Sequence, residues 1–191
     1  MKTLKTLVFT ASLLAAAPAF AEWKSVDDMS RVAFGSIKGD VTGEVHHFNR
    51  VSGTVSDDGK LSIAIDLASV ETNIDIRNER MAAHVFDGGK ASATLSGQID
   101  MDEINALKPG DSKVVEVFTT LAFAGSENDI DARMLVVRLD EDRVLVTTED
   151  FIMISTEDLG IEAGIDTLMQ LANLSGITRV TPVSVRMVFQ R

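Results

Sequence analysis

Apolar and polar residues alternate along most of the chain, and this period of two is typical of β-strands with one buried face. The clearest example is the run of Leu61, Ile63, Ile65 and Leu67 between smaller or polar residues. Similar segments lie at 30–37, 41–55, 91–99, 114–124, 132–140, 144–154 and 183–189. Turn residues such as Asp57-Asp58-Gly59 separate the segments, and short connections favour antiparallel neighbours. About eight antiparallel strands favour a sandwich or a closed barrel, and the barrel has no exposed edge to protect.

Two segments depart from this alternation. Residues 71–90 are expected to form a loop with a short helix. Residues 160–176 carry apolar residues at helical spacing, with Asp166 as the expected N-cap and Gly176 as the expected stop. The chain has no linker, internal repeat or low-complexity tract, so we expect one domain.

The first 21 residues have the pattern of a cleaved secretory signal peptide. Lys2 and Lys5 precede an apolar stretch over 7–16, and Ala19-Phe20-Ala21 places small residues at the cleavage position. The apolar stretch is about half the roughly 20 residues that a membrane span requires, which disfavours an anchor. We therefore expect export to the periplasm through the Sec pathway and a mature domain over 22–191.

Composition narrows the classes of function. The chain has 29 acidic and 18 basic residues, a net charge of −11, and removal of Lys2 and Lys5 with the signal makes the charge −13. Such a surface repels nucleic acid, so no nucleic-acid partner is expected. The absence of cysteine excludes disulfides, thiol catalysis and thiolate metal sites.

Residues suited to metal binding or catalysis are few. His46 and His47 are adjacent on a predicted strand, where neighbouring side chains point to opposite faces, so they cannot share one metal ion. His84 is the only other histidine, whereas a zinc site requires several converging ligands. Ser155, Asp150 and His84 could be arranged as a triad, but no serine stands in a Gly-x-Ser-x-Gly motif and no phosphate-binding glycine loop is present. We expect no catalysis, no metal and no cofactor.

One segment carries a specific resemblance to a known family. Ser69-Val70-Glu71-Thr72-Asn73, followed by Arg77, Met81 and Phe86, resembles the strand end and loop of the YceI-like family, also called the polyisoprenoid-binding family. Three further segments are similar to other strands of that family: 30–34, 48–55 and 180–185.

The chain departs from the family pattern in the loop that lies near the cavity mouth in that family. Asn78 stands where Asp is usual, Arg80 where His is usual, and Gly88-Gly89-Lys90 where Lys-Tyr-Pro is usual. These departures indicate a divergent member.

The resemblance implies an all-β fold, an eight-stranded antiparallel lipocalin-like barrel with one or two short helices. It also implies a periplasmic carrier for an amphiphilic isoprenoid, either a polyprenyl lipid or an isoprenoid quinone, held in the lumen. An eight-stranded barrel is wide enough for one slim ligand, and each methylene removed from water contributes about 0.8 kcal/mol. On this interpretation Arg77, Arg80 and Asn73 contact the head group, because guanidinium binds anionic or carbonyl oxygens. The residues expected to line the tail cavity are Phe34, Phe48, Leu67, Met81, Phe86, Leu95, Phe118, Phe123, Phe151 and Met153.

The sequence leaves alternatives open. Side chains can fill a small barrel, which would then act without a ligand through a protein partner in an envelope stress response. Small residues on the predicted inner faces, such as Ala93 and Gly97, favour a hollow lumen instead. Arg77 and Arg80 could equally form surface ion pairs with acidic residues of their own segment. A transmembrane barrel needs aromatic girdles, whereas this chain has no Tyr and one Trp. Transient contact with the inner membrane and a homodimer are further expectations.

Overall fold

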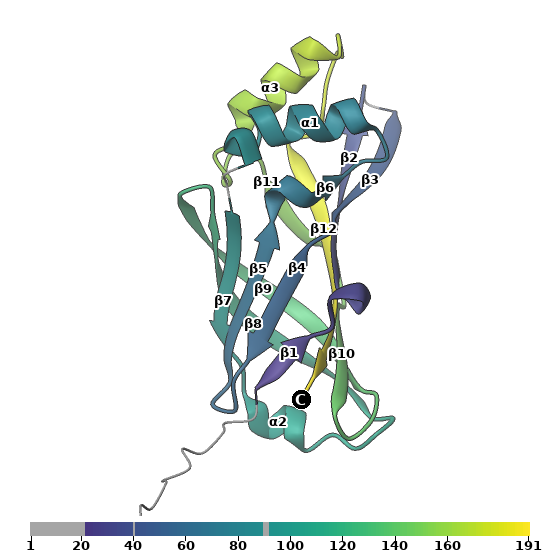
Figure 1. Ribbon diagram of the computed structural model, residues 1–191, viewed down its shortest axis with the longest axis vertical. Coiled ribbons are helices and arrows are strands. Elements are labelled where there is room, and N and C mark those ends of the chain that lie inside the picture. Colours follow the sequence, from purple (N-terminus) through teal and green to yellow (C-terminus); the bar gives the residue numbers. More distant parts are fainter. Residues whose placement is uncertain (1–21, 40, 90–91) are drawn as a thin grey trace, which may run out of the picture.

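The alternating segments pair into one antiparallel sheet that closes on itself as a barrel (Figure 1). The computed structural model describes residues 22–39, 41–89 and 92–191, so the predicted signal segment 1–21 lies outside the described residues. The strands are β1 (Trp23–Ser25), β2 (Arg31–Lys38), β3 (Thr42–Phe48), β4 (Val51–Val55), β5 (Lys60–Asp66), β6 (Val70–Glu71), β7 (Ser92–Gln98), β8 (Ser112–Phe123), β9 (Ser126–Arg138), β10 (Arg143–Thr148), β11 (Ile152–Ser155) and β12 (Val180–Gln190). Closure comes from β12, which pairs with β10 and β11 on one side and with β1 and β2 on the other.

Local interruptions divide some barrel strands into two labelled pieces. The pairs β1–β2, β3–β4, β5–β6 and β10–β11 each continue one strand across a short break. Counted in this way, eight antiparallel strands follow one another around the barrel in chain order, which confirms the predicted fold class. The predicted strands 41–55 and 144–154 are therefore each one barrel strand with an interruption that the alternation did not predict. At the break between β3 and β4, the backbone N–H of Asn49 donates to the Ser69 carbonyl oxygen and that of Arg50 to the Ser69 hydroxyl, both at 3.0 Å. These bonds replace the continuation of the strand ladder.

One phase of each strand faces the barrel interior and the other faces solvent. On β12 the inward side chains are Val183, Val185, Met187 and Phe189, in the alternation that the sequence predicts. Met187 and Phe189 are buried, whereas Val183 and Val185 are only half-buried although they also point inward. Inward side chains that keep accessible surface indicate that the interior is partly hollow.

Two helices cover the upper end of the barrel as drawn in Figure 1, α1 (Asp75–His84) and α3 (Glu162–Leu171). They confirm the helices expected within 71–90 and 160–176, but the ends of α3 differ from the prediction. Asp166 lies inside α3 rather than at its start, and its carboxylate forms an ion pair with Arg179, at the entrance to β12. The helix ends at Leu171, and Asn173, with φ of 49°, makes the turn that was expected at Gly176.

The two upper helices touch backbone to backbone at Gly164 of α3. A methyl group at this position would overlap the carbonyl oxygen of His84 and would lie 2.9 Å from the Cα of Val85, at the end of α1. Glycine is therefore required here by the close approach of the helices.

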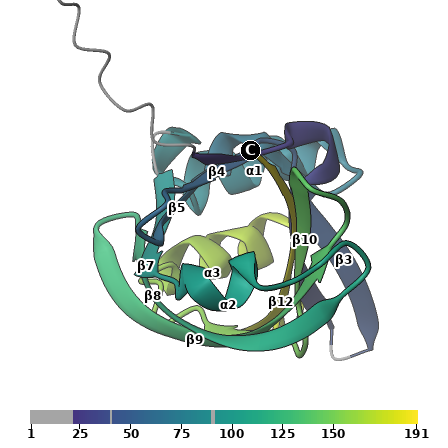
Figure 2. The ribbon, with the colours of Figure 1, turned by 90° about the horizontal axis from the view of Figure 1, so that it is seen from below.

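The lower end of the barrel is closed by side chains and by α2 (Met101–Asn105), a helix that the alternation did not predict (Figure 2). Met101 and Ile104 of α2 are buried against the interior. Trp23 is buried beside them, with the guanidinium groups of Arg138 and Arg191 5.1 Å and 5.4 Å from its ring centre. Within the described part of the chain, no helix is long and apolar enough to cross a membrane.

Candidate ligand-binding cavity

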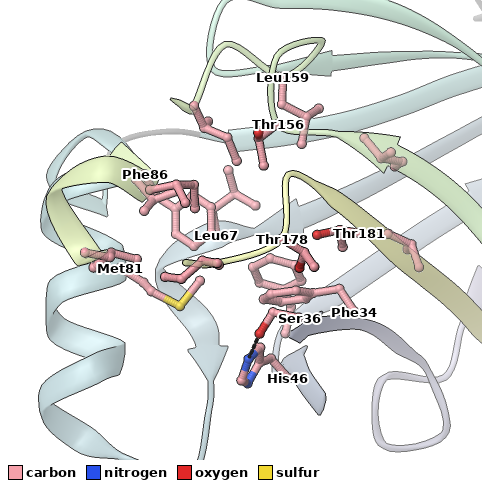
Figure 3. Close-up of a pocket in the computed structure, with 18 of the residues that line it drawn as sticks. Phe34, Ser36, His46, Leu67, Met81, Phe86, Thr156, Leu159, Thr178 and Thr181 are labelled. Carbon is pink, nitrogen blue, oxygen red and sulfur yellow. Dashed lines mark hydrogen bonds between the residues drawn. The ribbon is translucent and has the colours of Figure 1, made fainter. Parts of the chain in front are cut away.

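A cavity of about 230 Å³ occupies the upper half of the barrel, beneath α1 and α3 (Figure 3). A second cavity of about 100 Å³ lies in the lower half. The two lie end to end along the barrel, because Val183 lines the upper cavity and Val185, the next inward residue of β12, lines the lower one. Two residues of a strand span about 7 Å, so the two cavities lie close together along the barrel axis.

One side of the upper cavity is entirely apolar. We call it the apolar wall, and it consists of Ile65, Leu67, Phe86, Ala93, Leu121 and Phe123. These residues come from β5, from the turn after β5, from the end of the α1 segment, and from β7 and β8. Helix α3 adds Ile165 and Leu168 from above. The wall can take up a hydrocarbon chain without leaving a polar group unsatisfied.

A row of aromatic rings crosses the upper cavity. The ring centres of Phe34 and Phe48 lie 5.3 Å apart, those of Phe48 and Phe86 5.9 Å, and those of Phe86 and Phe123 6.2 Å. These spacings are typical of favourable aromatic contacts. The row joins β2 and β3 to β8 and fixes the shape of the cavity.

Another part of the cavity lining carries hydroxyl, imidazole and carboxylate groups. We call it the polar wall, and it consists of Ser36, Glu44, His46, Thr156, Thr178 and Thr181. The strands β3, β2, β12 and β11 are neighbours in the sheet and carry or adjoin these residues. Figure 3 shows most of them around the cavity.

Glu44 of the polar wall is held by two cationic side chains. Its carboxylate accepts a hydrogen bond of 2.6 Å from Arg77 and lies 3.8 Å from the Lys38 ammonium. Arg77 also donates to the carbonyl oxygen of Thr72 at 2.7 Å, so both terminal nitrogens of its guanidinium are engaged. The hydrogen bond from Arg77, together with its charge, lowers the pKa of Glu44. Glu44 is therefore ionised at neutral pH.

His46 is buried on the polar wall and shares a hydrogen bond of 3.0 Å between its Nε2 and the Ser36 hydroxyl. Its ring packs on Phe34 with 5.2 Å between ring centres. Burial lowers the pKa of His46, and the nearby positive charge of Arg77 lowers it further. The imidazole is therefore neutral at pH 7.

Comparison with known proteins gives similarity only among solved structures. No protein-family model matches the chain. No curated protein matches it. A polyisoprenoid-binding domain from Saccharophagus degradans, implicated in plant cell wall breakdown, superposes with a TM-score of 0.85 and 32% sequence identity over 90% of this chain and 98% of that one. The chain belongs to the YceI-like family. BcnA from Burkholderia cenocepacia shares the fold, with a TM-score of 0.66 and 16% identity over 86% of this chain and 98% of its own.

The segment that carries the YceI-like resemblance builds the junction between β6 and α1. Asn78 of α1 accepts hydrogen bonds from the Thr72 N–H at 2.8 Å and from the Thr72 hydroxyl at 2.6 Å. It also donates to the Glu71 carboxylate at 3.1 Å. The Arg77 bond to the Thr72 carbonyl completes this network. The motif therefore fixes the position of α1 over the cavity.

The residues predicted for the head group do not all lie together. Arg77 and Arg80 line the upper cavity. Arg77 is paired with Glu44 of β3, a partner 33 residues away, rather than with acidic residues of its own segment. The expectation that Asn73 contacts the head group is corrected, because this residue lies outside the cavity lining and is exposed in a turn with φ of 60°.

The residues predicted for the tail cavity divide according to strand phase. Six of the ten line the upper cavity: Phe34, Phe48, Leu67, Met81, Phe86 and Phe123. Leu95 lines the lower cavity. The remaining three are corrections, since Phe118, Phe151 and Met153 lie on the outer surface with 63%, 70% and 61% of their area exposed.

The corrections have one physical cause. On β8, Val117 and Thr119 face the interior, so Phe118 between them must face outward. On β11, Ile152 and Ile154 face the interior, so Met153 between them must also face outward. Gly97 also differs from its expected role. A methyl group there would lie 2.8 Å from the carbonyl oxygen of Phe118, so this glycine permits close strand contact rather than cavity space.

Sequence reasoning missed the polar wall. His46 was considered only as a metal ligand beside His47, and within the described residues no group of three His, Asp or Glu side chains could hold a metal ion. The alternation of inward and outward residues along β3 would have revealed part of the polar wall, because Glu44, His46 and Phe48 lie on the same face of that strand. Thr156 lies in a loop, where no such periodic signal exists.

Proposed function

We propose that this protein is a periplasmic carrier that holds one isoprenoid amphiphile, a polyprenyl lipid or an isoprenoid quinone, in its barrel. The observation that supports this proposal is a pair of adjacent interior cavities, of which the upper one has both an apolar wall and a polar wall. A solid core would leave no such cavities, which disfavours a filled barrel that acts only through a partner. The similar Saccharophagus degradans domain is described as polyisoprenoid-binding.

The two ends of the barrel suggest the orientation of the ligand. Trp23 and α2 close the lower end, whereas the polar residues gather at the upper end beneath α1 and α3. The tail would run down the apolar wall toward the lower cavity, and the polar end would remain above. Each buried methylene contributes about 0.8 kcal/mol, so a tail of several isoprene units supplies most of the affinity.

Charge also favours an oxygen-bearing group at the upper end. Three cationic side chains, Lys38, Arg77 and Arg80, line the upper cavity with one carboxylate, Glu44. This excess of positive charge stands on a chain whose net charge is −11. It attracts electron-rich oxygen atoms, either anionic or carbonyl.

A binding role, rather than catalysis, agrees with the lining of the cavity, which is largely hydrocarbon. The signal pattern of residues 1–21 supports a periplasmic location, and collection of the ligand would require brief contact with the inner membrane.

The test is mass spectrometry of an organic extract from protein purified out of the periplasm without detergent. We expect a stoichiometric prenyl lipid or quinone. The variant Ile65→Trp fills the apolar wall and should lose the ligand, whereas Ala64→Trp, on the outer face of the same strand, should retain it. A ligand-free extract, with no uptake of prenyl lipid on later incubation, would refute the carrier function and favour a barrel that acts through protein contacts.

A further inference from the structure

The strands that carry most of the polar wall are apolar on their outer side. Ser36, Glu44, His46 and Thr181 of the neighbouring strands β2, β3 and β12 line the upper cavity (Figure 1). The residues between them face outward, because successive side chains of a strand point to opposite faces. A sheet with one buried face normally places its polar residues outside. The reversed arrangement here indicates that the outer side makes a contact of its own.

Strand register joins these outward residues into one surface, which we call the outer apolar face. Val45 of β3 pairs with Gly35 of β2, and Met153 of β11 pairs with Pro182 of β12. The two pairs adjoin, because a methyl group on Gly35 would lie 3.0 Å from Pro182. Val45 and Met153 remain 73% and 61% exposed. The outer apolar face consists of Gly35, Ile37, Val45, Met153, Val180 and Pro182.

No charged side chain interrupts the outer apolar face. From this face down to the pair Arg31 and Arg186, the outward positions of β2, β3, β11 and β12 hold no Asp, Glu, Lys or Arg. Charged residues make up 25% of the chain, so such a surface is unusual for it. A contiguous exposed apolar patch bordered by polar residues marks a contact with a protein or a membrane.

The two arginines at the lower border of the outer apolar face lack an acidic partner. Arg31 and Arg186 are paired directly across β2 and β12, and both are exposed. Neither forms an ion pair with any residue that the structure describes. Asp150, in the break before β11, pairs with Arg133 instead. Like charges directly opposite each other destabilise a sheet, so this pair points to an anionic group outside the chain.

We propose that the outer apolar face docks this protein on a phospholipid bilayer, with its apolar side chains in the interface and Arg31 and Arg186 on lipid phosphates. This inference rests on the proposed function and names the surface through which the carrier meets the membrane. Guanidinium binds phosphate oxygens in pairs, and the long arginine side chain reaches the headgroups while its stem lies on apolar surface.

The outer apolar face continues to the rim of the upper cavity. Ile37 of the face precedes Lys38, which lines the cavity. The Ile37 carbonyl oxygen accepts a hydrogen bond of 3.1 Å from the N–H of Thr178, another lining residue. Val41, in the turn between β2 and β3, is 86% exposed beside this rim. Docking by the outer apolar face therefore brings the opening of the cavity to the bilayer.

A second copy of this chain fits the outer apolar face less well. Four strands about 4.8 Å apart, with two rows of outward residues about 7 Å apart, cover a few hundred Å², whereas a stable dimer needs about 800 Å² from each partner. A second copy would also add its own Arg31 and Arg186 and no carboxylate on the same face, so none of the guanidinium groups would gain a partner.

Vesicle co-sedimentation of the full-length mature protein tests the docking surface, with vesicles of phosphatidylcholine alone or mixed with phosphatidylglycerol. Val45→Glu places a charge in the outer apolar face and should weaken binding to both kinds of vesicle by about tenfold. Phe118→Glu is the matched control, because Phe118 is 63% exposed on β8, outside the face. The control should bind like the parent protein, and circular dichroism should show that both variants are folded.

A second pair of variants tests the arginines. Arg31→Gln with Arg186→Gln should weaken binding to the vesicles with phosphatidylglycerol by about tenfold, and binding to phosphatidylcholine much less. Arg133→Gln with Arg143→Gln removes the same charge from side chains that already pair with Asp150 and Asp140, and should bind like the parent protein. Equal losses in the two double variants would show an effect of net charge and would overturn the role of Arg31 and Arg186.

Uptake of geranylgeraniol separates the docking surface from the proposed function. Val45→Glu should take it up from vesicles more slowly than the parent, and equally well from a dispersion without vesicles. A parent that takes up geranylgeraniol without binding vesicles, or vesicle binding that Val45→Glu leaves unchanged, would overturn the docking surface and leave the carrier function standing. A dimer that Val45→Glu dissociates, without vesicle binding by the parent, would assign the face to a second copy. Failure of uptake by both routes would overturn the carrier function, whatever the vesicle binding.

Discussion

The contact between α1 and α3 allows a prediction whose sign depends on the structure. Gly164 lies within α3, where replacement by alanine normally stabilises a helix by about 1 kcal/mol. In this fold the added methyl group would overlap the His84 carbonyl oxygen and approach the Val85 Cα to 2.9 Å. Both are backbone atoms, so no side-chain rotation can relieve the overlap, and one helix must move.

Overpacking of this kind costs about 1–3 kcal/mol. After the gain in helix propensity, Gly164→Ala should reduce the free energy of unfolding by up to about 2 kcal/mol. With a urea dependence of about 2 kcal/mol per molar, the midpoint should fall by up to about 1 M. The displaced helix also carries Ile165 and Leu168 of the cavity lining, so ligand affinity should fall as well.

The assay is urea unfolding followed by tryptophan fluorescence. Trp23 is the only tryptophan and is buried at the opposite end of the barrel, so its emission reports global unfolding rather than local movement of α3. The matched control is Gly43→Ala in β3, because no atom lies within 4 Å of a methyl group there. The control should change stability by no more than about 0.5 kcal/mol. A Gly164→Ala midpoint equal to or above that of the parent would refute the close approach of the helices.

Three further predictions concern stability. Trp23→Ala should lower the free energy of unfolding by about 3–5 kcal/mol, measured by circular dichroism because the variant has no tryptophan. On acidification, stability should first decline below pH 6.5, because burial lowers the pKa of His46 and the unfolded chain takes up its proton first. A second decline should follow below pH 4.5, where the lowered pKa of Glu44 has the same effect, and His46→Phe should lack only the first decline in a pH series of urea midpoints. Asn78→Ala leaves the N–H of buried Thr72 without its acceptor and should lower the unfolding free energy by about 1–3 kcal/mol in urea.

Alternation predicted the barrel because its strands have one apolar and one polar face. It did not predict the breaks within those strands. At 49–50 the chain leaves the ladder because Ser69, in the turn between β5 and β6, offers hydrogen-bond acceptors, and this partner is 19 residues from Arg50 in sequence. The start of α3 was misjudged for a related reason, since Asp166 has the chemistry of an N-cap but lies inside the helix and pairs with Arg179 in the folded chain.

The candidate site was predictable only where strand phase was applied. Phe34, Phe48 and Phe123 line the upper cavity because they share the phase of their apolar neighbours. Phe118 and Met153 were selected for residue type, and the phase of their strands directs them outward. The polar wall requires the order of the strands around the closed barrel, which brings β3 and β11 to the same side through β2 and β12. No local pattern in the sequence contains that order.

The departures from the family pattern can now be related to the position of α1. Where the family pattern has a carboxylate, Asn78 accepts from Thr72 and also donates to Glu71, and a carboxylate at 78 could accept but would repel Glu71. Arg80, in place of the usual histidine, lines the cavity and reaches the Leu171 carbonyl at the end of α3 with a long contact of 3.5 Å. Both changes therefore act on contacts that position the upper helices, while Arg77 keeps its place beside Glu44. The departures at 78 and 80 accordingly lie in how the helices cover the cavity, and this cover is a feature that would select the proposed ligand.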